Sequence, residues 1–499
     1  MKNYRDKGAG KMAKVLEIGQ KFFKGYQNIF EFLFFVFLFG VLSFGRAFSI
    51  LYIDTPAVPL FITEILLLTA LPLLISRGNF FSFLPRYFQA AVLIYFFIGG
   101  FYFLRGMVIQ NPYALRDIVF CGYILFLPLT FIVFSRLRKI KILLAVLLVS
   151  NVVAVLLGRF FILDVYNVPV LRYLVPRTKL FNLSLYYGIT MSLLISFWGF
   201  YREFTAKILI LLLSAVNLYM LLFLGVRTSW VAVMACLVYF FFVYKVKFLK
   251  FLIIFIPFFL IVGGALYHFD FASVHKNVAL WSKLKSTVIF ISDVIKAKKS
   301  SVFSKGAPPG SVYKDTQADF PLGTPLYVAQ KPVIYASFSD NNKNDFDSIL
   351  WRVDIWKQTA NFGLDSPLLG QGFGKYPSYK NWGYPLDPPK RIDTGSGILP
   401  AHNHLLAIFY KMGLVGLGLF LFINIYVLVF GLKLMGRCQS DFLRRFVAGT
   451  LSAFVFWHAM ALFFDLIDSP PTSIFLWFLM GLVFAVSQIE KFESARNKA

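Results

Sequence analysis

Charged residues, and acidic residues most of all, are scarce in this chain. Only 15% of its 499 residues are charged, and 24 Asp and Glu stand against 50 Lys and Arg. Hydrophobic residues make up 58% and aromatic residues 19%, with a mean hydropathy of +0.70. A soluble domain of this length carries far more polar surface, so the composition excludes the soluble class and indicates an integral membrane protein.

Cysteine and histidine are also rare. The three cysteines, Cys121, Cys236 and Cys438, are scattered, so they form neither a metal-binding pattern nor an obvious disulfide pair, and we interpret them as small apolar residues. Two of the 5 histidines, His402 and His404, lie one residue apart in PAHNHLL. No Cys, Asp or Glu clusters with them in the sequence, so a metal site is not expected.

Long apolar runs dominate what is present. A membrane-spanning helix needs about 17 to 25 predominantly apolar residues, and about twelve runs meet this requirement. They lie near residues 29–45, 57–76, 87–104, 118–134, 140–158, 181–200, 207–225, 229–244, 249–267, 413–435, 445–464 and 472–488. The predicted fold is therefore all-α, a polytopic membrane helix bundle. A basic leader without a small-residue cleavage site precedes the first run, so no cleavable signal peptide is expected.

Basic residues in the short loops predict the orientation. If the N-terminus is cytoplasmic, the inner loops carry basic clusters such as those at 136–141 and 245–250, and both termini lie inside. The net charge of +26 then reflects mostly membrane topology, so nucleic acid is not an expected partner.

The stretch from 268 to 403 differs from the other loops. It contains the turn signals GAPPGS, SDNNKN and GYPLDPPK together with aromatic islands such as LWRVDIW, which predict a small folded cap on the outer side. Residues 281–299 place apolar side chains on one helical stripe between lysines, which indicates a helix on the membrane surface. We interpret residues 300–345 as an irregular insertion.

Five arginines fall on the outer side, where short translocated loops normally lack them. They are Arg105, Arg116, Arg172, Arg177 and Arg227. A costly charge in such a position is a functional-site hypothesis, and the planar guanidinium matches phosphate oxygens in a bidentate way. The alternative interpretation is snorkelling, or contact with lipid headgroups.

Arg227 is the strongest of these candidates. It lies in LFLGVRTSWVAV, between two runs with almost no loop, so the tight turn is expected to hold it against the bundle. Gly225 permits the turn, and Thr228 or Ser229 is predicted to cap the next helix. The N-terminus of that helix adds its partial positive charge to the arginine.

The histidine motif predicts a proton-accepting group beside a helix start. Pro400 suits the beginning of a helix, and Gly413 is expected to end the apolar run that follows. His402 and Asn403 then lie at a helix N-terminus just outside the membrane. Histidine titrates near neutrality and can take a proton from a hydroxyl, while Asn403 can orient a sugar. His404 is expected to face solvent or headgroups.

A third motif lies upstream, in SILWRVDIWKQTANFGLDSPLLGQGFG. Arg352 and Trp356 share one face of a predicted helix, and SPLLGQGFG then forms a glycine-rich turn. No strand precedes these glycines, so a nucleotide-binding fold is rejected. The glycines instead allow a tight backbone path near the site.

Together these motifs resemble the signature of the O-antigen ligase and O-antigen polymerase superfamily. The similar elements are R-x-x-x-W (Arg352 to Trp356), S-P-L-L-G-x-G-F-G (Ser366 to Gly374), A-H-N-x-L with G-L-x-G-L (Ala401 to Leu417), and G-x-R-x-x-W around Arg227. The layout, with one large outer loop between the ninth and tenth runs, is similar too. The motif resemblance covers roughly residues 220–430.

The resemblance implies a GT-C-like membrane glycosyltransferase of the bacterial inner membrane, with its active site facing the periplasm. The donor would be a glycan on undecaprenyl pyrophosphate. The acceptor would be lipid A–core in a ligase, or another carrier-linked unit in a polymerase, with no metal or other cofactor. Arginines stabilise the charge of a leaving pyrophosphate and a base activates the acceptor hydroxyl. Without paired carboxylates, direct and inverting attack is favoured.

The implied domain organisation follows the same pattern. The predicted parts are a cytoplasmic basic leader at 1–28, transmembrane helices one to nine at 29–267, a periplasmic loop or cap with the motifs at 268–403, a periplasmic helix start and helices ten to twelve at 404–488, and a cytoplasmic tail at 489–499.

The predicted catalytic residues are His402 as the base, with Arg227 and Arg352 binding the pyrophosphate. The predicted substrate contacts are Asn403, His404, Trp356, Arg105, Arg116, Arg172 and Arg177. Membrane lipids are further expected partners. A transporter or flippase is disfavoured because no internal repeat is visible and acids within the runs are few. A non-enzymatic scaffold has no reason to gather arginines and histidine at one membrane face.

Overall fold

The computed structural model describes residues 2–49, 51–53, 60–76, 81–108, 113–162, 180–224, 226–273, 341–377, 401–464 and 466–496. Arg172, Arg177 and the helix predicted at 281–299 lie outside the described residues. The chain divides into two compact units, one formed by Met1–Val274 and Ile355–Ala499 and the other by His275–Asp354. Of the smaller unit, only residues 341–354 are described, and they form the first part of α15 (Asn341–Leu364).

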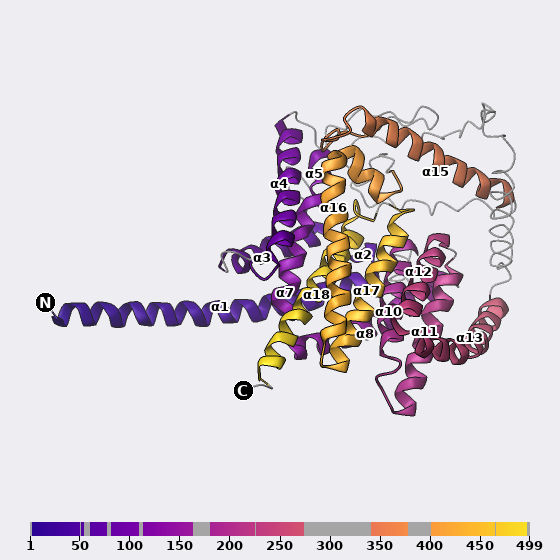
Figure 1. Ribbon diagram of the computed structural model, residues 1–499, viewed down its shortest axis with the longest axis horizontal. Helices are drawn as coiled ribbons and strands as arrows, with labels where there is room; N and C mark the ends of the chain where they lie inside the picture. The colour runs from indigo at the N-terminus through magenta and orange to yellow at the C-terminus, as the bar shows by residue number, and fades with distance from the viewer. Residues whose placement is uncertain are drawn as a thin grey trace. The chain divides into compact units, whose positions relative to one another are not determined.

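Helices make up nearly all of the larger unit (Figure 1). The elements before residue 163 are α1 (Lys2–Phe44), α2 (Arg46–Ser49), β1 (Tyr52–Ile53), β2 (Leu60–Phe61), α3 (Ile62–Ser76), α4 (Arg86–Val108), α5 (Tyr113–Asp117), α6 (Val119–Gly122), the 3-10 helix η1 (Tyr123–Leu125), α7 (Phe126–Phe134) and α8 (Leu137–Ile162). The next are α10 (Leu180–Phe197), α11 (Phe204–Phe223), α12 (Arg227–Tyr244) and α13 (Val246–Ser273). The last are α16 (His404–Arg437), α17 (Asp441–Ala461) and α18 (Pro470–Arg496).

A helical segment coincides with every predicted membrane run. Among the described residues, 9 segments are long and apolar enough to cross a membrane, and α3 and α10 are shorter apolar helices. The remaining predicted run, at residues 445–464, corresponds to α17. The strands β1 and β2 form a single antiparallel pair in the described part of the chain. The prediction of an all-α polytopic bundle is therefore confirmed.

Two helices differ in detail from the predicted runs. The basic leader and the first run form one continuous helix, α1, which ends before Gly45 at φ 55°. The run at 118–134 is assembled from α5, α6, η1 and α7. Proline lacks an N–H and its ring clashes with the carbonyl four residues earlier, so Pro128 disfavours regular α-helix at Ile124, where the chain forms the 3-10 turn.

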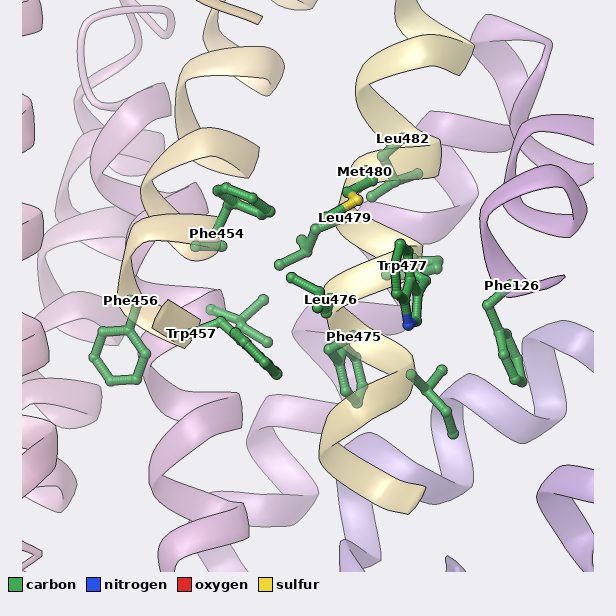
Figure 2. Packing of buried hydrophobic residues seen from close by; sticks show 14 of the residues in the cluster. Phe126, Phe454, Phe456, Trp457, Phe475, Leu476, Trp477, Leu479, Met480 and Leu482 are labelled. Carbon is green, nitrogen blue, oxygen red and sulfur yellow. The ribbon is translucent and has the colours of Figure 1, made fainter. Parts of the chain in front are cut away.

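The core of the larger unit surrounds α18, which is apolar on every side and packs against α7 and α17. Trp477 on α18, Trp457 on α17 and Phe126 on α7 are fully buried there (Figure 2). Small residues let α17 approach α10 closely: Gly188 lies against Phe456, and Gly449 lies against Leu193. These two contacts also show that α10 and α17 run antiparallel.

Candidate active site

The PAHNH motif lies at the start of a long helix, as the sequence predicts. Asn403 is the N-cap of α16, and its side-chain oxygen accepts hydrogen bonds from the backbone N–H groups of Leu405 and Leu406, at 3.0 and 3.1 Å. These N–H groups have no partner inside the helix, so the cap stabilises the helix start. The side-chain oxygen of Asn403 is therefore engaged in capping, and its amide nitrogen is the group left for the predicted substrate contact.

His402 has a backbone conformation that is uncommon for a residue other than glycine. Its φ is 50°, in the left-handed region. The side chain is half-buried, and its ring centroid lies 6.3 Å from that of Phe464, just beyond the end of α17. Surroundings that hold a histidine in this conformation at a helix start support a functional hypothesis for the residue.

His404 points into the bundle, not toward solvent or headgroups. It is buried between α16 and α17, with its ring centroid 5.7 Å from that of Phe420 and 5.6 Å from those of Trp457 and His458. His404 begins the helix, but the packing of α16 on α17 decides which side it faces. The expectation of an exposed His404 is therefore wrong, because its ring is buried among aromatic side chains.

The helix α16 is broken at Gly413, where φ is 65° and ψ is −167°. The predicted end of the first helical run is thus an interruption, after which the helix resumes. Backbone groups freed by the break pair with the glycine-rich loop at 366–374. The carbonyls of Tyr410 and Lys411 accept from Gln371 and Gly372, at 2.7 and 3.0 Å. Because a membrane offers no water to satisfy these groups, the loop and the break stabilise each other.

Close backbone contact at this junction requires glycine. A Cβ atom on Gly413 would lie 2.2 Å from the carbonyl oxygen of Leu368, and one on Gly370 would lie 2.5 Å from the backbone nitrogen of Gly413. Both glycines also have positive φ, of 65° and 74°. Any side chain at either position would separate the loop from the helix, which is the physical reason for the predicted tight path.

A buried charge pair holds this junction to α5. Lys411 and Asp117 have side chains 1% and 0% exposed, and the Lys411 Nζ lies 2.5 Å from Asp117 Oδ2. The same carboxylate accepts from the backbone N–H of Gly374 at 2.7 Å and from the Tyr376 hydroxyl at 2.5 Å. Lys411 also lies over the ring of Tyr376, 3.9 Å from its centroid. Asp117 therefore joins α5, the glycine-rich loop and the first half of α16.

A second ion pair lies beside the first. Arg116, a predicted substrate contact, pairs with Asp468 between α17 and α18, with 2.9 Å between Nη2 and Oδ2. Burial raises the pKa of Asp468 above its usual value, and Asp117 adds to this effect while Arg116 opposes it. Burial and the Asp117 charge likewise raise the pKa of Tyr376, so its hydroxyl stays protonated and donates.

Arg227 is the first residue of α12 and is half-buried. The N-cap is Val226, which has no side-chain oxygen, and the Ser229 hydroxyl donates to the Val226 carbonyl at 2.6 Å. The prediction that Thr228 or Ser229 caps the helix is therefore wrong, because α12 begins earlier and places both residues inside its first turn. Gly225 lies outside the described residues.

Arg227 and His402 lie at the same end of the bundle. The hairpins α10–α11–α12 return α12 to the direction of α10, so α12 runs antiparallel to α17. The Cys236 thiol contacts the Ser452 carbonyl at 3.3 Å. On α12, Arg227 lies 9 residues before Cys236 (236 − 227), and on α17, Ala461 lies 9 residues after Ser452 (461 − 452). Each separation is about 13.5 Å along the helix axis. His402 packs just beyond Ala461. Arg227 and His402 therefore lie at about the same depth along the bundle axis, and we call this end of the bundle the His402 end.

Two further predicted residues lie at the His402 end. Arg105, in the last turn of α4, is exposed beside a groove of about 290 Å³ that Leu369 of the glycine-rich loop and Met412 also line. Trp356 packs its ring 6.2 Å from that of Phe463 after α17. Arg352 lies one turn before Trp356 on α15, on the same helix face.

Residues 208–421 match the family model of O-antigen ligase. The matched segment contains Arg227, the α15 motif, the glycine-rich loop and the PAHNH motif, and the match confirms the relationship to the O-antigen ligase and polymerase superfamily. No curated protein matches the chain. The chain is thus a multi-pass membrane protein in which one segment, residues 208–421, is similar to the O-antigen ligase family.

The sequence patterns did not reveal the buried charges that hold the matched segment to the preceding helices. Lys411 interrupts an apolar run, which is itself a signal of a functional or paired charge. Its partner Asp117 precedes the matched segment and lies 294 residues away, so no local pattern connects them. In the described parts of the chain, no three His, Cys, Asp or Glu residues gather as metal ligands do.

Proposed function

We propose that this protein is a glycosyltransferase that moves a preassembled glycan from undecaprenyl pyrophosphate to lipid A–core. The reaction takes place at the periplasmic face of the bacterial inner membrane, with both termini cytoplasmic. The family match supports the reaction class. The observation that carries the proposal is that Arg227 and His402 lie at the same end of the bundle.

In the proposed reaction, His402 takes the proton of an acceptor hydroxyl as that oxygen attacks the anomeric carbon of the donor sugar. The bond from that carbon to the pyrophosphate oxygen breaks, the configuration inverts, and the electron pair leaves with the pyrophosphate. General base catalysis of this kind contributes about 10² to 10⁴ in rate.

Positive charge at the His402 end suits a pyrophosphate leaving group. We assign Arg227 to its oxygens, because a guanidinium donates two parallel hydrogen bonds to phosphate. The motif resemblance gives Arg352 the same role. The N-terminus of α12 adds its partial positive charge beside Arg227. Charge stabilisation strengthens as water is excluded, and Arg227 is half-buried. Trp356, Asn403 and Arg105 remain proposed contacts of donor or acceptor.

The Asp117–Lys411 pair is proposed to position this machinery. It fixes the first half of α16, whose N-terminus carries His402, against the glycine-rich loop. Catalytic groups must be held close to the productive geometry, which explains a rigid junction made of backbone hydrogen bonds and a buried ion pair.

Complementation of a deletion strain tests the proposal. Wild-type chain restores glycan-capped lipid A–core on surface-glycan electrophoresis, whereas Arg227→Ala, Arg352→Ala and His402→Ala do not, although each accumulates in the membrane. Arg437→Ala, at the opposite end of α16, is the matched control and retains capping. If the deletion leaves a single repeat on the core, the enzyme is a polymerase. Normal capping by both Arg227→Ala and His402→Ala refutes the site.

A further inference from the structure

An apolar groove lies at the end of the bundle opposite His402. Its volume is about 310 Å³, at the lower end of the range of about 300–1,000 Å³ typical of small-molecule sites. The floor is formed by α10 and the walls by α8 and α11. The lining includes the apolar residues Leu144, Leu148, Leu193, Leu194, Phe197 and Leu209. The groove is a feature of the membrane-spanning helices and is separate from the proposed active site.

The groove opens toward the surroundings of the bundle. Leu193 and Leu194 on the floor are buried, whereas Leu148 and Leu209 on the walls are exposed. In a membrane-spanning bundle, such an opening faces hydrocarbon. An acyl chain fits this apolar lining, while a polar ligand would lose hydrogen bonds to water there.

Positive charge gathers where the groove reaches the end of the bundle. Lys141 lies one turn before Leu144 on α8, and Arg202 and Lys207 flank the start of α11. The Lys141 ammonium lies 5.9 Å from the ring centroid of Phe442, and that of Lys207 lies 6.0 Å from the ring centroid of Trp198.

Three other cations at this end of the bundle are paired with acids. Lys139 pairs with Glu31, and Arg444 and Arg445 pair with Asp441. At the groove itself, the acidic side chain next to the cations is Glu203, which is exposed and precedes α11. Lys141, Arg202 and Lys207 therefore leave a net positive charge beside an apolar groove.

We propose that this groove is a binding site for one anionic phospholipid of the phosphatidylglycerol class. One acyl chain lies along Leu193, Leu194 and Phe197, and the phosphate lies among Lys141, Arg202 and Lys207. A basic pocket between transmembrane helices is the usual form of such a site. Since the lipid binds the folded bundle only, it also stabilises the packing of α8, α10 and α11.

Native mass spectrometry of the purified full-length protein tests this site. The probes are phosphatidylglycerol and phosphatidylethanolamine with the same acyl chains. We expect phosphatidylglycerol to bind more tightly, and Lys141→Ala/Lys207→Ala to weaken its binding roughly fivefold for each cation removed. The matched control is Lys433→Ala/Arg437→Ala, which removes two exposed cations of α16 at the same end of the bundle and leaves binding unchanged.

A groove-filling variant tests the acyl chain separately. Leu194→Trp places a larger side chain on the floor and so fills part of the groove without changing the charge. We expect it to weaken phosphatidylglycerol binding while all three cations remain. Three results overturn the proposal: equal binding of the two lipids to the wild type, equal binding of phosphatidylglycerol to the groove and control double variants, or unchanged binding to Leu194→Trp. Because lipid retention is measured without any glycan, failure of the proposed transfer reaction leaves this test intact.

Discussion

Replacement of Lys411 by methionine tests the role of the buried charge pair. Both side chains are almost fully buried, so Lys411→Met leaves the Asp117 carboxylate without its cation in a place that water does not reach. Removal of one partner from a buried ion pair costs about 3–5 kcal/mol. Two hydrogen bonds to Asp117 remain, from Gly374 and Tyr376, and they favour the lower end of that range.

The double variant Asp117→Asn/Lys411→Met provides the comparison. Replacing both members of a buried pair is often neutral, because no unpaired charge remains, and the asparagine oxygen still accepts a hydrogen bond. We expect Lys411→Met to lower the midpoint of thermal unfolding in detergent by several degrees, and the double variant to recover most of that loss. Surface-glycan electrophoresis then tests whether the pair positions the catalytic groups. The double variant is expected to fold, yet to cap less lipid A–core than the wild type.

Two outcomes would refute this reasoning. Unchanged unfolding of Lys411→Met would mean that the pair contributes nothing to the junction. A double variant as unstable as the single variant would mean that the unpaired charge is not the cause. Full capping by a stable double variant would restrict the pair to a purely structural role.

Three further predictions follow from the described contacts. Gly413→Ala is expected to prevent accumulation of folded protein, because the new Cβ meets a loop carbonyl at 2.2 Å, whereas Gly418→Ala, with no atom within 4 Å, is tolerated; equal expression of the two would contradict the close junction. His404→Phe is expected to retain lipid A–core capping, since its ring lies among aromatic side chains; loss of capping with normal expression would instead indicate a substrate contact. Cys438 is expected to resist maleimide in intact protein at neutral pH and to react after denaturation, because burial raises its pKa to about 12; rapid labelling of intact protein would exclude this burial.

The membrane-spanning fold was largely predictable because hydrocarbon imposes a length and an apolar composition on each crossing. The same logic selected Arg227 and His402 as candidates, since charge and histidine at an outer boundary stand out against an apolar background. The interruptions within helices and the residues at which helices begin were less predictable. The 3-10 turn before Pro128 and the start of α12 ahead of Thr228 depend on short-range geometry within a run, not on its composition.

The supporting part of the site was not predictable from local patterns. Asp117 and Lys411 are brought together only when α5 packs against α16, and the break at Gly413 finds its partners in a loop that precedes it by about forty residues. His404 shows the same limit, because a helix start fixes its position along the chain while tertiary packing decides its direction. In each case the deciding interaction is between elements distant in the sequence.

A reconstituted transfer reaction tests the central claim most directly. Purified protein is incubated with an undecaprenyl-pyrophosphate-linked glycan and lipid A–core, and both the glycan linkage and the released undecaprenyl pyrophosphate are measured. We expect equal amounts of transferred glycan and released carrier with the wild type, and a loss of about 10² to 10⁴ in rate for His402→Ala. Wild-type rates in both His402→Ala and Arg227→Ala would contradict it.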